Sequence, residues 1–139
     1  MDFVIYLSTF RGALQIISYT LQRINELYQT GELIINFDNT NIEHILPQKP
    51  DKTWNLSRED IKDYVDKIGN LTLLHKKKNS GVGNKSVKDK VHGLSTSDIG
   101  ITRQIAKIIE SSDYKWGEKE INQRQRDFAK LAYEKVWTV

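Results

Sequence analysis

The spacing of hydrophobic residues predicts helices at both ends of the chain. Between Leu7 and Thr30 the apolar residues recur at intervals of three and four, which is the stripe of an amphipathic helix. Gly31 follows it, where a glycine commonly ends a helix. Two more helical stripes lie at residues 97–111 and 121–136. Most of the chain is therefore expected to be helical.

Strand-like segments occupy the middle of the chain. Residues 42–46 form the first strand candidate, and Pro47, which cannot donate to a ladder, closes it. Residues 70–74 form the second, and residues 57–68 between them begin with a capping-box pattern that predicts a short helix. Residues 33–37 are a further short strand or an extended lead-in. Together these segments predict an α+β fold, in which helices flank one small β-hairpin.

The segment 76–90 is unusually polar, with six lysines and two glycines. Its composition predicts a loop or a flexible basic segment. A short helix beginning near Ser80 or Asn84 is the alternative, because either side chain can cap a helix.

Composition narrows the class of protein. A length of 139 residues favours one domain, and the absence of cysteine excludes disulfides and thiolate metal sites. The net charge of +3 is compatible with nucleic acid binding without requiring it. No long uncharged stretch predicts a membrane span or a secretory signal, so we expect no membrane partner and a cytoplasmic location. A helix that begins near residue 7 without a cap hints at a fragment of a longer protein.

Four residues have types and spacing that suit phosphodiester hydrolysis. Glu43 and His44 end the first strand candidate, Asn70 opens the second, and Asn79 lies nine residues further on. A histidine can take the proton from an attacking water, and a divalent cation can neutralise the phosphate oxygens. Mg²⁺ prefers oxygen ligands, which Glu43 and the two asparagine amides offer. The spacing therefore indicates a nuclease site.

Each of these residues also has a simpler interpretation. Taken alone, His44 is a half-buried structural residue, Asn70 a turn residue and Asn79 a solvated one. Only the joint spacing favours a site. Adjacent residues on a strand also point to opposite faces. Either the strand twists near His44, or Glu43 faces elsewhere and Asn79, waters and substrate phosphate hold the metal.

Several motifs resemble the C-terminal HNH-like domain of GmrSD-type restriction enzymes. They are residues 42–48, residues 68–74 and the later Asn79, Asn84 and Lys90. That family belongs to the His-Me finger, or ββα-metal, nucleases. Two further stretches, Thr20–Ile24 and Trp116–Arg124, are also similar to it, so the resemblance covers most of the chain. It implies a mostly helical domain that carries a ββα-metal finger built on the small hairpin.

The resemblance also implies roles for individual residues. His44 matches the general base, and Asn70 matches the asparagine that orients the histidine and braces the loop. Glu43 and Asn79 match metal ligands, with Mg²⁺ or Mn²⁺ as the expected ion. Asn84 matches a residue that supports the site.

The lysines of the polar segment are expected to attract the DNA backbone. They are Lys76, Lys77, Lys78, Lys85, Lys88 and Lys90. The last of them matches a family position to which we assign a phosphate contact. One departure from the family is Val87, which stands where an aromatic residue is common.

One HNH-like nuclease domain over residues 1–139 is therefore predicted. It comprises a helical lead-in (1–37), the finger (38–92) and a helical C-terminal part (93–139). The resemblance implies a fused or associated ParB-like nucleotide-hydrolysing domain and a role in restricting foreign or modified DNA. Two alternatives stay open: a nucleic-acid-binding or regulatory module that has lost catalysis, and a helical interaction domain whose polar residues are only surface.

Overall fold

The computed structural model describes residues 14–31, 34–78 and 85–136 of the chain. Its centre is a two-stranded antiparallel sheet of β1 (Thr40–His44) and β2 (Leu71–His75). The register pairs the first residue of each strand with the last of the other. The predicted hairpin is therefore present, with both strands close to the expected positions.

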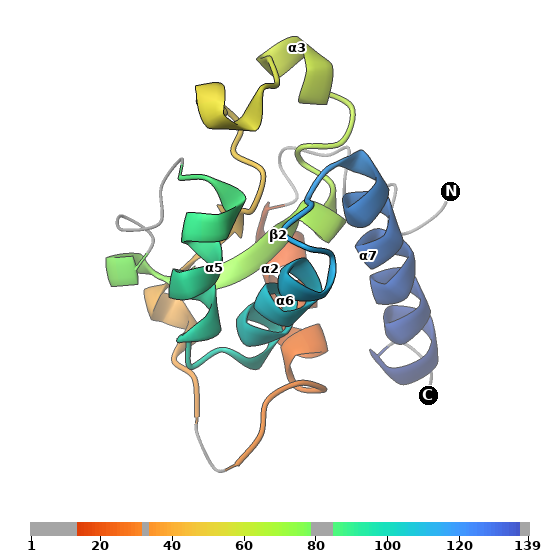
Figure 1. Ribbon diagram of the computed structural model, residues 1–139. Coiled ribbons are helices and arrows are strands. Elements are labelled where there is room, and N and C mark those ends of the chain that lie inside the picture. Colours follow the sequence, from red (N-terminus) through yellow and green to blue (C-terminus); the bar gives the residue numbers. More distant parts are fainter. Residues whose placement is uncertain (1–13, 32–33, 79–84, 137–139) are drawn as a thin grey trace.

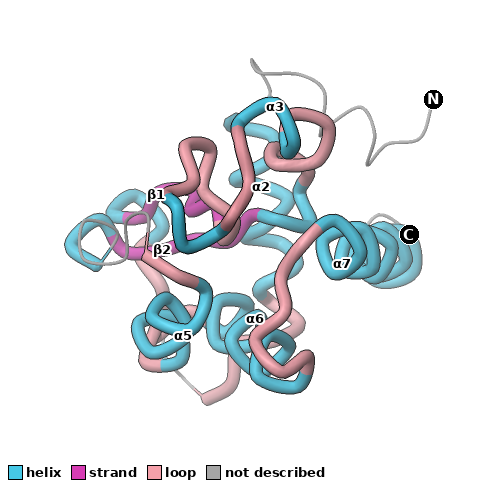
Figure 2. The backbone as a smooth tube through the Cα atoms, turned by 45° about the horizontal axis from the view of Figure 1, so that its top comes forward, coloured by secondary structure: helices cyan, strands magenta, loops and turns pink. Residues whose placement is uncertain are grey.

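Helices enclose this hairpin. They are α2 (Leu14–Asn25), α3 (Arg58–Ile61), α5 (Val87–Ser95), α6 (Gly100–Ser111) and α7 (Glu118–Leu131). Short 3-10 segments are η2 (Phe37–Asn39), η3 (Lys52–Trp54) and η4 (Ile68–Asn70), and a π-helical turn, η5 (Ala132–Val136), follows α7. Helix α2 lies on one side of the hairpin, while α5 and α6 lie on the other (Figures 1 and 2). The fold is the predicted mixture of helices with one small hairpin.

The hydrophobic core has one part on each side of the hairpin. The α6-side cluster includes Leu74, Leu94 and Ile105, whereas the α2-side cluster includes Leu21 and Leu73. Successive residues of β2 alternate between the two clusters because side chains of a strand point alternately to its two faces. Both faces of β2 are covered, so four of its five residues are buried.

Several elements differ in extent from the sequence predictions. Helix α3 has the predicted capping box of Ser57 and Asp60, but it ends at Ile61 and a turn replaces its second half. Residues 34–36 form no strand, and Asn36 instead caps η2. In the polar segment, residues 76–78 are helical. Helix α5 begins after Ser86, which was not among the predicted caps and whose hydroxyl accepts a hydrogen bond from the Asp89 backbone N–H. The predicted caps Ser80 and Asn84 lie outside the described residues.

Gly69 is required by packing. A Cβ on this residue would lie 2.1 Å from the Ile121 carbonyl oxygen, so only a glycine allows α7 to approach this closely. Its N–H donates to Gln125 Oε1 at 3.0 Å, and its carbonyl accepts from Arg124 at 3.0 Å. Helix α7 is thereby fixed against the turn that leads into β2.

Candidate active site

His44 is the last residue of β1, and its imidazole belongs to a small polar cluster that reaches solvent. Its Nε2 lies 2.9 Å from Asp66 Oδ1, and Gln48 Nε2 donates to the same oxygen at 3.0 Å. The His44 side chain is 22% exposed and that of Asp66 58%. A histidine held by a carboxylate and open to water is suited to proton transfer.

Asn70 is completely buried, and both the oxygen and the nitrogen of its side-chain amide make hydrogen bonds. Its Oδ1 accepts from the Leu46 backbone N–H and from the Trp116 indole, each at 2.9 Å. Its Nδ2 donates to the carbonyls of Leu46 at 2.9 Å and Val65 at 2.7 Å. Asn70 therefore braces the backbone that follows His44. None of these four bonds reaches the imidazole, so any orienting effect passes through that backbone.

Glu43 points to the opposite side of β1 from His44. It pairs across the hairpin with Thr72, whose hydroxyl lies 2.9 Å from that of Thr102 on α6. The carboxylate is nearly buried, and its Oε1 lies 3.0 Å from Lys90 Nζ on α5. The strand keeps its normal alternation at this point, as the second of the two predicted arrangements requires.

The prediction that Lys90 contacts a phosphate needs correction. Its side chain is fully buried, and its ammonium donates to Glu43 Oε1 at 3.0 Å and to the His44 carbonyl at 2.8 Å. Burial lowers the pKa of Lys90, while Glu43 opposes that shift. Lys90 is thus an internal partner of both residues and presents no charge to DNA.

The described residues do not by themselves form a metal site. Among them no group of three or more His, Asp or Glu side chains is placed to hold an ion. Glu43 offers the hard oxygen atoms that Mg²⁺ prefers, but Lys90 already neutralises its charge. Asn79, the other predicted ligand, lies outside the described residues, as does Asn84. The metal site stays a prediction.

A family model for the C-terminal domain of GmrSD restriction endonucleases matches residues 1–131. The chain belongs to this family. No curated protein and no solved structure matches it. Membership makes this a restriction-endonuclease-related domain and suggests nuclease activity on DNA. In the part of the GmrSD C-terminal domain that the structure describes, no helix has both the length and the apolar character needed to cross a bilayer.

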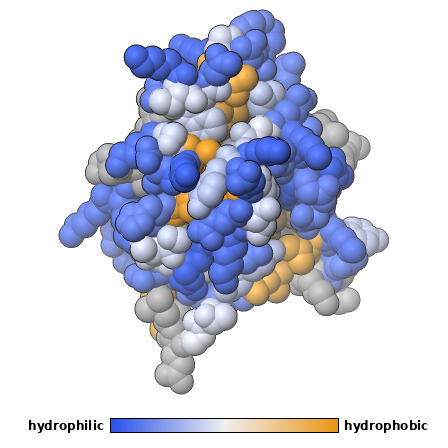
Figure 3. All heavy atoms as spheres, viewed as in Figure 1, coloured by the Kyte–Doolittle hydropathy of each residue, from blue (hydrophilic) through white to orange (hydrophobic). Residues whose placement is uncertain are grey.

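The remaining predicted DNA-binding lysines of the GmrSD domain lie on its surface. Lys76, Lys77, Lys85 and Lys88 are exposed, and Lys78 is half-buried. The face in Figure 3 is largely hydrophilic, with apolar residues showing only in patches. The lysine run 76–78 follows β2 at the end of the hairpin opposite His44, roughly 14 Å away along the strand. A duplex bound to both would have to span that distance.

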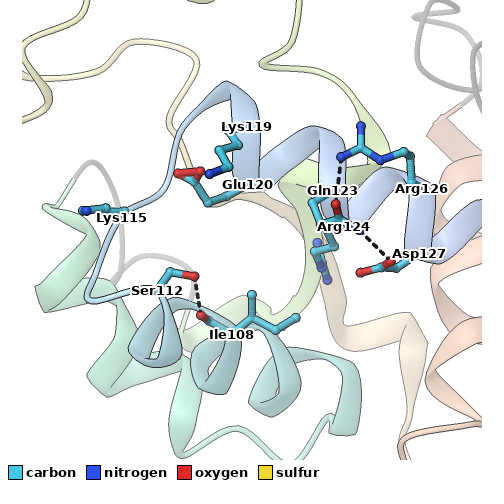
Figure 4. Close-up of a pocket in the computed structure, with 9 residues that line it drawn as sticks. All are labelled: Ile108, Ser112, Lys115, Lys119, Glu120, Gln123, Arg124, Arg126 and Asp127. Atoms are coloured by element: carbon cyan, nitrogen blue, oxygen red, sulfur yellow. Dashed lines mark hydrogen bonds between the residues drawn. The ribbon is translucent and has the colours of Figure 1, made fainter.

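A separate hollow of about 430 Å³ lies between the end of α6 and α7 (Figure 4). Its lining contains both acidic and basic side chains. The neutral amide of Gln123 links two of them, because Arg126 donates to its oxygen and its nitrogen donates to Asp127. Arg124, also in the lining, is buried, which lowers its pKa to about 9. Its guanidinium donates to the Leu71 carbonyl at 2.6 Å and lies over the Phe128 ring.

Sequence reasoning missed two partners of the site. Asp66 is 22 residues from His44, in a segment with several acidic residues, and no spacing distinguishes it from them. Trp116, which donates to Asn70, was noted only as part of the family resemblance. Nothing local in the sequence connects either residue to the hairpin.

Proposed function

We propose that this GmrSD C-terminal domain is an HNH-type, metal-dependent DNA endonuclease with His44 as its general base. The observation that carries the proposal is the solvent-reaching imidazole at the end of β1, held by Asp66 2.9 Å away. Family membership supplies the substrate class. A general base must reach a water molecule and be held in one orientation, and His44 meets both conditions.

The reaction follows from the position of His44. The imidazole takes a proton from a water molecule, and the resulting hydroxide attacks the phosphorus. The bond from phosphorus to one ester oxygen breaks, and that oxygen takes a proton from solvent. The products are one phosphate end and one hydroxyl end. Because Glu43 faces away from His44 and pairs with Lys90, Mg²⁺ or Mn²⁺ would be held by Asn79, water and the substrate phosphate, and would stabilise the charge on the phosphate.

The wider setting of the activity is also proposed from the family. The exposed lysines attract the DNA backbone, and this attraction carries little sequence specificity. Choice of target, including modified DNA, is assigned to a fused or associated ParB-like nucleotide-hydrolysing domain. The site of action is the cytoplasm, where foreign DNA is restricted.

Nicking of a supercoiled plasmid tests this function. With Mg²⁺ or Mn²⁺ the wild-type protein should convert plasmid to the open circle, and EDTA should abolish conversion. His44→Ala should lower the rate by about 100-fold or more, as expected for loss of a general base. His92→Ala is the matched control, because His92 is exposed on α5, away from the cluster around His44. Asn79→Ala should reduce the response to metal.

Two outcomes would reject the proposal. One is a His44→Ala variant that nicks as fast as wild type, and the other is a wild-type protein inactive with every divalent metal. The second outcome would favour a nucleic-acid-binding module without catalysis. The Glu43–Lys90 pair supports that alternative, because it neutralises a predicted metal ligand. Duplex binding that weakens with salt, without cleavage, would establish it.

A further inference from the structure

The hydrogen bond between His44 and Asp66 determines which imidazole nitrogen can act as a base. Asp66 Oδ1 faces Nε2 at 2.9 Å. The Asp66 carboxylate is more than half exposed, and water favours its ionised form, which accepts hydrogen bonds but cannot donate them. Nε2 must therefore carry the hydrogen. A neutral imidazole has only one N–H, so the lone pair is on Nδ1.

Gln48 holds the carboxylate in place. Gln48 Nε2 donates to the same Oδ1 at 3.0 Å, and Gln48 lies only four residues after His44. The carboxylate thus receives two hydrogen bonds from the chain that leaves β1. Both contacts keep it directed at Nε2.

We infer that Asp66 is the positioning residue of His44, fixing the ring in the tautomer that leaves Nδ1 free to accept a proton. The inference rests on the proposed function for its chemical consequence, but the tautomer can be measured without it. An exposed pair of this kind contributes little to stability. The effect of Asp66 should therefore appear in the catalytic rate and in the state of the ring.

Asp66→Asn separates this role from a merely structural one. The variant has the same shape, but its neutral amide either accepts from Nε2–H more weakly than a carboxylate or presents its N–H₂ group to Nε2. Either change weakens the preference for a hydrogen on Nε2. Asp63→Asn is the matched control, because Asp63 is exposed in the same turn and the charge change is identical. Asp66→Glu retains a carboxylate and should restore the wild-type behaviour in part. Circular dichroism would check that all three variants fold.

The first measurement is the ¹⁵N chemical shifts of the His44 ring in DNA-free protein. Wild type and Asp63→Asn should show hydrogen on Nε2, and Asp66→Asn should move population to the other tautomer. In the nicking assay, Asp66→Asn should lower kcat by about 10- to 100-fold, the usual loss when a group that orients a histidine is removed, with little change in KM.

The outcomes separate this inference from the proposed function. An unchanged tautomer in Asp66→Asn overturns the inference, whether or not the protein cuts DNA. A tautomer shift in a protein that never cuts supports the role of Asp66 and rejects the endonuclease proposal. A shift together with a fall in kcat, absent from Asp63→Asn, supports both.

Discussion

Glu43 and His44 are neighbours on one strand, yet they occupy opposite environments. Glu43 is almost buried against α5, where Lys90 neutralises it, whereas His44 reaches solvent beside an exposed carboxylate. The alternation of side chains along a strand produces this separation. Of the two motif residues, Glu43 therefore makes a structural contact inside the domain, whereas His44 is available for chemistry at the surface.

The Glu43–Lys90 ion pair and the His44–Asp66 hydrogen bond should differ in energy as they differ in exposure. A buried pair gives little net stability, but removal of one partner leaves a charge without compensation. An exposed pair is screened by water and contributes about 1 kcal/mol at most. Mutations on the Glu43 side should therefore change stability, and mutations on the His44 side should change activity.

The largest expected effect is that of Lys90→Met. Loss of the ammonium leaves Glu43 buried without a partner and should lower the free energy of unfolding by about 3–5 kcal/mol, measured by urea denaturation. Lys88→Met, at an exposed position on the same helix where the ammonium lies 5.2 Å from the centre of the Tyr114 ring, should lower it by about 1 kcal/mol at most. If the double variant Glu43→Leu, Lys90→Met is no more stable than Lys90→Met, the unpaired carboxylate of Glu43 is not the cause of the lost stability.

The second-largest effect is expected for Asn70→Ala, which should lower the free energy of unfolding by about 3 kcal/mol. The change leaves the backbone of Leu46, the Val65 carbonyl and the Trp116 indole without their buried partner. Trp116→Phe removes only one of these bonds and should cost less in the same urea experiment. Equal losses in the two variants would mean that the indole bond dominates.

His44→Ala should change the free energy of unfolding by less than about 1 kcal/mol, although it removes the proposed base. Its side chain is partly exposed, and the carboxylate that it contacts, Asp66, is more than half exposed. Urea denaturation beside the nicking assay measures both effects on one preparation. A loss as large as that of Lys90→Met would make His44 a structural residue and remove the contrast between the two sides.

The smallest effect is expected at the α3 cap, away from both pairs. Hydrogen bonds from Ser57 lower the pKa of Asp60, so this carboxylate stabilises the fold above its ordinary pKa and loses that contribution as the pH falls through the lowered value. Asp60→Asn removes the carboxylate that accepts from the Ser57 backbone N–H, so it should shift the urea midpoint slightly at pH 7 and not at pH 2. An equal shift at both pH values would exclude the carboxylate as the source.

Local sequence patterns predicted most of the fold, because its helices have regular hydrophobic periodicity and some element ends are marked by capping or turn residues. The stripe of α6, the strand predicted at residues 70–74 and the cap at Ser57 all correspond to features of the structure. Helix α3 is shorter than predicted, since a capping box fixes where a helix begins and not where it ends. The finger helix after β2 stays a prediction, because residues 79–84 lie outside the described part.

The site was less predictable because it depends on contacts between distant segments. Six lysines in one polar segment look alike in sequence, and only packing shows that Lys90 lies under Glu43. Asp66 had no signal at all, since its partner is on another element. Asn70 was predicted to orient the histidine and brace the loop. Its four hydrogen bonds hold the backbone around Leu46, and its role in catalysis stays a prediction.

Because Lys90 is buried, the reactivity of its amine can report opening of the domain. Amine-selective reagents modify lysines in proportion to their access to water, so Lys88 should label readily and Lys90 hardly at all. Lys90 becomes reactive only when α5 separates from the hairpin. The labelling rate at this one amine, read by mass spectrometry, would therefore report how often the domain opens at the strand that carries His44.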